Sequence, residues 1–118
     1  MDDRFERGLE RFNARDFFEA HEIWEDLWHE YRESDRTFLQ GLIQLAAGLY
    51  HLDAGNTKGA ASQLIKGTAK LRPYAPSHRG MDLNALLNDV SACLKILEGD
   101  DPASAVSPSI FPAIRSSD

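Results

Sequence analysis

Apolar residues recur at three- and four-residue steps along nearly the whole chain. Phe5, Leu9 and Phe12 follow this spacing near the start, and the stripe between Leu83 and Leu97 follows it near the end. No stretch alternates between apolar and polar residues as a half-buried strand does. The pattern predicts an all-α fold. Because the 118 residues are 42% hydrophobic, we expect one compact helical bundle rather than two domains or a disordered chain.

Capping residues and helix breakers divide this pattern into about five helices. We expect helices over residues 3–12, 16–32, 36–54, 57–72 and 83–98, joined as antiparallel helix hairpins. Pro73, Pro76 and Gly80 predict a loop before the last of them. Residues 1–99 are therefore predicted as a single helical domain. Residues 100–118 hold three prolines and five serines, and we expect them to form an irregular tail.

Small residues repeat at an interval of 40 residues. Gly8 corresponds to Gly48, and Ala20 corresponds to Ala60, each pair at a similar place in a helix–turn–helix unit. Small residues that face each other allow two helices to approach closely. The pattern faintly resembles a tetratricopeptide hairpin, although two units are fewer than a solenoid needs.

The charge of the chain is unevenly distributed around a net value of −6. Residues 1–35 carry twelve acids and five arginines, whereas no acid occurs between Ala54 and Met81. A net negative chain does not favour nucleic-acid binding, which depends on neutralising phosphates. The acid-free segment predicts contact with an acidic partner, which is either the N-terminal half of the same molecule, a second copy or another ligand. Its basic residues are Lys58, Lys66, Lys70, Arg72 and Arg79.

The longest uncharged run, Thr37–Leu52, has 16 residues. A membrane-spanning helix needs about 20, so we expect no membrane partner. The acidic start of the chain is unlike a secretion signal, and the single Cys93 excludes a disulfide framework, which together predict a cytoplasmic protein. The uncharged helix has more apolar surface than short helices easily cover, which predicts a homodimer.

Two polar residues interrupt the aromatic side of the second predicted helix. Phe17, Ala20 and Trp24 lie on one face of this helix, and His21 and Glu25 lie at the margin of that face. They are one turn apart, so their side chains can meet. Because a carboxylate placed among aromatic rings is costly without a partner, we expect Glu25 to be withdrawn from water and held by His21 or by a ligand.

The third predicted helix carries its polar residues on a face of small residues. Gln40, Gln44 and His51 share that face with Ala47 and Gly48. If this helix packs antiparallel to the second, Gln44 and His51 point towards His21 and Glu25. The alternative is that these polar groups face water or a dimer partner.

These two helices also carry a family resemblance. The motif His-x-x-x-Glu-x-x-Trp falls on His21, Glu25 and Trp28, and the segment from Phe38 to Ala47 follows. Together they closely resemble the prokaryotic domain of unknown function 309 family, over residues 12–97. The resemblance implies a small helical bundle and places a site at the motif, for which metal binding has been suggested. The family's activity is uncharacterised.

Three interpretations of the motif remain open. The first is a divalent metal site for Zn²⁺, Mn²⁺ or Fe²⁺ formed by His21, Glu25 and either His51 or Gln44, which can activate water for hydrolysis if a position stays free. The second is a helix-hairpin interaction module without catalysis. The third is a buried polar cluster of His21, Glu25 and Trp28 that only fixes how the helices pack.

Overall fold

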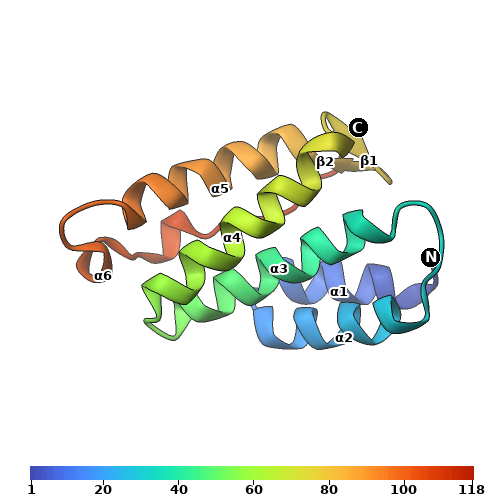
Figure 1. Cartoon of the computed structure of the whole chain (residues 1–118), viewed down its shortest axis with the longest axis horizontal. Helices are drawn as coiled ribbons and strands as arrows, with labels where there is room; N and C mark the ends of the chain where they lie inside the picture. The colour runs from blue at the N-terminus through green and yellow to red at the C-terminus, as the bar shows by residue number, and fades with distance from the viewer.

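Five long helices form the computed structural model, which describes residues 1–118 (Figure 1). The all-α prediction is confirmed. The helices are α1 (Asp3–Asn13), α2 (Phe17–Glu30), α3 (Arg36–Asp53), α4 (Thr57–Leu71) and α5 (Leu83–Leu97). The shorter elements are η1 (Arg72–Tyr74), β1 (Ser77–His78), β2 (Met81–Asp82), α6 (Pro102–Ala105) and η2 (Pro108–Ile110). No helix combines the length and the apolar character that crossing a bilayer requires.

Helix α3 is the centre of the bundle. It lies between α2 and α4, with α1 against α2 and α5 against α4 (Figure 1). Ten of its residues are buried, which explains why the run Phe38–Leu52 carries no charge. The expectation that this run leaves apolar surface uncovered is therefore wrong, because the chain covers that surface itself. The apolar surface of this helix therefore gives no support to the predicted homodimer.

The 40-residue repeat is a repeat of geometry. We name α1–α2 the first hairpin and α3–α4 the second hairpin. Their turns contain Arg15 with φ 64° and Gly55 with φ 84°, at equivalent positions. The next backbone amide donates back to the helix in both turns, from Asp16 to Arg11 (2.9 Å) and from Asn56 to His51 (2.8 Å). Both hairpins therefore make the same turn.

Glycines bring the two helices of each hairpin close together. A methyl group on Gly8 would come within 2.0 Å of Trp24 Nε1, and one on Gly48 would come within 2.9 Å of Leu64. Trp24 is fully buried, and its Nε1 donates a hydrogen bond to the Phe5 carbonyl (3.1 Å). The close helix approach that the small residues predict is present in both units.

A short β-hairpin and the C-terminal tail close one end of the bundle. Strands β1 and β2 are joined by Arg79 and Gly80, which both have positive φ angles, of 49° and 75°. The residues after α5 return along the body: Asn13 exchanges two hydrogen bonds with the Ile114 backbone (2.7 and 2.9 Å), and Ser116 pairs with Met81 of β2. The sequence predicted only a loop where the β-hairpin lies.

Candidate ligand-binding groove

A groove of about 350 Å³ lies between α2 and α4, with α3 as its floor. A smaller hollow of about 180 Å³ adjoins it, and His21 and Ala47 line both. The lining residues of the groove are His21, Glu25, Trp28, His29, Gln40, Ile43, Gln44, Ala47 and Gln63. The hollow adds Phe18, Tyr50 and His51.

Glu25 lies between two imidazoles on α2. Its Oε2 is 2.9 Å from His21 Nε2, and its Oε1 is 3.8 Å from His29 Nε2. His21, Glu25 and His29 are spaced by four residues, so they form one row along the helix. The sequence analysis predicted the first contact and did not include His29, whose side chain is 63% exposed. The second four-residue step was the signal that would have included His29.

The expectation that Glu25 is withdrawn from water is wrong. Its side chain is 45% exposed, because α2 turns Trp24 to the core and leaves Glu25 at the rim of the groove. The ring of nearby Phe18 is itself 51% exposed. A carboxylate in this position has no need of a partner to offset burial, so the interpretation as a buried polar cluster loses its physical basis.

Gln44 and His51 occupy different parts of this surface. Gln44 lines the groove with His21 and Glu25, and its Oε1 accepts a hydrogen bond from Lys70 Nζ (2.9 Å). His51 lines the adjoining hollow, and its Nδ1 lies 3.3 Å from the Asn56 side-chain nitrogen. No three His, Cys, Asp or Glu side chains are grouped closely enough to hold a metal ion. The predicted donors His21 and Glu25 are adjacent, but His51 does not join them.

Trp28 forms one wall of the groove. The guanidinium of Arg36 lies 3.6 Å from the centre of its ring and donates to its carbonyl oxygen (3.1 Å). Burial of Arg36 against the ring lowers the pKa of this guanidinium. The Trp28 Nε1 is buried and has no hydrogen-bond partner within the chain. The indole is thus fixed in position while its donor stays unused.

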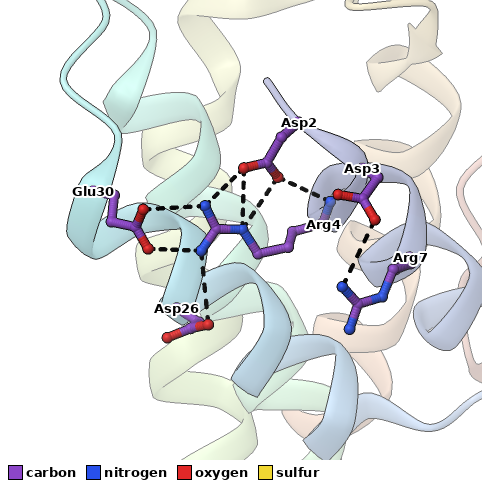
Figure 2. Close-up of polar contacts among 6 residues, drawn as sticks. All are labelled: Asp2, Asp3, Arg4, Arg7, Asp26 and Glu30. Atoms are coloured by element: carbon purple, nitrogen blue, oxygen red, sulfur yellow. Dashed lines mark hydrogen bonds and ion pairs between the residues drawn. The ribbon is translucent and has the colours of Figure 1, made fainter.

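The outer face of α2 is neutralised by an arginine from α1 (Figure 2). Arg4 contacts Glu30 (2.8 Å) and Asp2 (2.7 Å), and Figure 2 shows its guanidinium between these two carboxylates. Hydrogen bonds from Arg4 lower the pKa of Glu30 and bring that of Asp2 to about 2. Glu25, in contrast, has no arginine or lysine partner and contacts only histidines.

A second polar cluster was missed by sequence reasoning. Asp35, only 8% exposed, accepts hydrogen bonds from the Tyr31 hydroxyl, from Arg79 Nε (2.7 Å) and from His78, whose Nε2 lies 2.9 Å away. Burial raises the pKa of Asp35, but these hydrogen bonds outweigh it and hold the pKa well below its usual range. The partners are 43 and 44 residues apart, so no local pattern indicates the cluster.

The basic residues assigned to an acidic partner separate into two groups. Arg79 is used within the chain, by Asp35 and Tyr31, which agrees with the alternative that this segment contacts the N-terminal half of the same molecule. The others form no ion pair with any acid of the chain; they are Lys58, Lys66, Lys70 and Arg72.

Comparison with known proteins places these features in a family. The family model DUF309, described as a domain of unknown function, matches residues 5–63, which is half of the chain. The chain belongs to the DUF309 family. The groove residues from His21 to Gln63 lie within the DUF309 match, whereas Lys66, Lys70 and the β-hairpin lie beyond it.

A curated relative carries no functional information. The chain is 38% identical over 76 residues to the "Uncharacterized protein YpuF" of Bacillus subtilis (strain 168). The aligned region is 63% of this chain and 42% of YpuF, so the chain spans less than half the length of that relative. The DUF309 assignment thus confirms the family resemblance and indicates no activity.

Proposed function

We propose that this DUF309 protein is a binding protein whose ligand site is the groove, with Glu25 as the central contact. The support comes from a comparison inside the chain. The positions 40 residues after His21, Glu25 and His29 hold Ala61, Ile65 and Ala69. The second hairpin makes the same turn with no ionisable group at these positions. The row of polar side chains is therefore not a requirement of the hairpin, which favours a role in binding.

The donor types suit a divalent transition-metal ion. Imidazole nitrogen and carboxylate oxygen are ligands of Zn²⁺, Mn²⁺ and Fe²⁺. His21 and Glu25 would hold the ion, and no third side chain of a ligating type joins them. A bound ion would supply positive charge and free coordination positions for an oxygen ligand. The exposure of Glu25 leaves room for water to complete the coordination.

Metal titration of the tag-free chain tests this proposal. We expect Zn²⁺ or Mn²⁺ to bind with a stoichiometry near one per chain by calorimetry, and Glu25→Ala and His21→Ala to weaken binding by about tenfold or more. His51→Ala is the matched control, since it removes an imidazole from the same face and should leave the affinity unchanged. Binding that Glu25→Ala does not alter, or no binding at all, would exclude a metal site at the row.

A second candidate is protein binding at the same surface. Phe18 and Tyr50 are 51% and 42% exposed, and their rings lie 5.2 Å apart across the α2–α3 boundary. An exposed aromatic pair within a polar rim is typical of contact sites. Phe18→Ser should then weaken association with the bound protein without changing the metal affinity of the chain. An unchanged association constant in this variant would remove the aromatic pair from the contact.

A further inference from the structure

We propose that a second copy of this chain docks on the groove face, with α4 of each copy lying on α2 of the other. The face consists of α2, α3 and α4, which lie side by side (Figure 1). Glu25 also belongs to the proposed metal site, so the dimer is tested in the absence of metal.

The groove has banks of opposite charge. The acidic bank consists of Glu25, which lines the groove, and Glu22, which lies outside the groove on the exposed side of α2. Lys66 and Lys70 on α4 form the basic bank. Gln63 lines the groove, and Lys66 and Lys70 follow it by three and seven residues, so all three lie on one face of α4.

Neither bank is neutralised within the chain. Glu22 and Glu25 contact only histidines, and Lys66 and Lys70 have no acidic partner. On the outer face of α2, by contrast, Arg4 contacts Asp26 and Glu30. A face that carries unpaired charges of both signs can be electrostatically complementary to the same face of a second copy.

The two banks lie at the same level along α3. Gln44 lines the groove together with Glu25, and its amide oxygen is bonded to Lys70. Rotation by 180° about an axis along α3 exchanges the α2 and α4 sides and preserves the level along the axis. Each acidic bank then faces the basic bank of the other copy. A two-fold dimer of this kind is closed and self-complementary.

The floor of the groove is compatible with contact between identical surfaces. Its α3 residues Gln40, Gln44 and Ala47 are uncharged, and the side-chain amides of Gln40 and Gln63 have no partner in the chain. Each Gln side chain both donates and accepts, so it can pair with polar groups of the other copy. Three helices of 14–18 residues offer only a modest area, so we expect a dimer of micromolar strength.

Sedimentation equilibrium in the presence of a chelator tests the dimer. We expect the wild type to change from monomer to dimer as the protein concentration rises from about 10 µM to 1 mM. Lys66→Glu/Lys70→Glu makes both banks acidic, and Glu22→Lys/Glu25→Lys makes both basic, so each variant alone should associate at least about tenfold more weakly. An equimolar mixture of the two should restore the dimer, because every bank then faces its opposite. Circular dichroism checks that each variant is folded.

The control is Lys95→Glu/Glu98→Lys on α5, which changes the same kinds of charge away from the face and should leave association unchanged. A wild type that stays monomeric up to the highest concentration would overturn the proposal. So would a dimer that both bank variants retain, or a mixture that stays monomeric. The chelator separates this result from the metal proposal, whose failure would leave the dimer intact.

Discussion

The two helix hairpins of this protein share their turn and differ in what they present at the surface. Both turns place a residue with positive φ at the same position, Arg15 in the first and Gly55 in the second, and both return a backbone hydrogen bond to the preceding helix. The first hairpin carries the row His21–Glu25–His29, whereas the second carries small and apolar residues there. The turn conformation that the two hairpins share is a requirement of the fold. The polar row, which only the first hairpin carries, indicates function.

The hairpins also differ in how tightly each is packed. A methyl group on the glycine of the first would lie 2.0 Å from the ring of Trp24, and one on the glycine of the second would lie 2.9 Å from the Leu64 side chain. Glycine is therefore required more strictly at Gly8 in the first hairpin than at Gly48 in the second.

The largest expected effect is that of Gly8→Ala. The added methyl group overlaps the buried Trp24 ring, which the hydrogen bond to Phe5 holds in place, so we expect a loss of about 3 kcal/mol in the free energy of unfolding. Gly48→Ala should cost about 1 kcal/mol, because Leu64 can shift and alanine favours the helix. Urea denaturation measures both. Equal losses would show that the two contacts are equally strict.

Asp35 lies where the two hairpins join, and its replacement should have the next largest effect. Asp35→Asn weakens hydrogen bonds to Tyr31, His78 and Arg79, and we expect a loss of about 2 kcal/mol at neutral pH. Glu33→Gln, an exposed neighbour without an ion pair, is the control and should leave stability unchanged.

The effect of Asp35 should depend on pH. Its pKa is lower in the folded than in the unfolded chain, so its ionised form stabilises the fold above about pH 4. That stabilisation is lost as the pH falls through the folded-state value. The difference between wild type and Asp35→Asn should therefore shrink on acidification below about pH 4. A difference that stays constant would mean that hydrogen bonding, not charge, is responsible.

The two turns provide a smaller contrast. Gly55→Ala should destabilise by about 1 kcal/mol, because the positive φ is unfavourable for alanine and no atom lies near its added methyl group. Arg15→Gly should change stability by less than about 0.5 kcal/mol, since relief of backbone strain is offset by a more flexible unfolded chain. Thermal unfolding compares the two. A large loss in Arg15→Gly would instead identify its contact with Phe111 (4.3 Å) as important.

The smallest effect is expected where the hairpins differ most. Glu25→Ile and Ile65→Glu exchange equivalent exposed residues, and each should alter the free energy of unfolding by less than about 0.5 kcal/mol. Destabilisation by Glu25→Ile above about 2 kcal/mol, measured in urea, would mean that the row supports the fold, and the internal comparison would lose its force.

Local rules predicted most of the fold. Asp82 caps α5 by accepting a hydrogen bond from the Ala85 amide (3.0 Å), and Asn56 caps α4 by accepting one from the Gly59 amide (2.9 Å). The helix limits follow because capping and apolar spacing act within a few residues. The contact between His21 and Glu25 was predictable for the same reason.

Contacts between distant segments were not predictable in this way. Angular position on α2 placed Glu25 at the margin of the apolar face, but its exposure depends on how far α1 and α3 extend over that margin. The Asp35 cluster depends on a β-hairpin that positive φ angles at Arg79 and Gly80 create more than 40 residues later. Neither position carries a sequence pattern that fixes its neighbours.

The returning tail has a consequence for the mechanics of the molecule. Ile114 is bonded to Asn13 at the turn of the first hairpin, and the Ser117 amide donates to the Gly80 carbonyl in the β-hairpin (2.8 Å). Residues 114–117 thus connect the turn of the first hairpin to the β-hairpin. A displacement at one of these two contacts is passed to the other through the tail. The positions of the Asp35 cluster and of the α1–α2 turn are therefore coupled by residues that belong to neither.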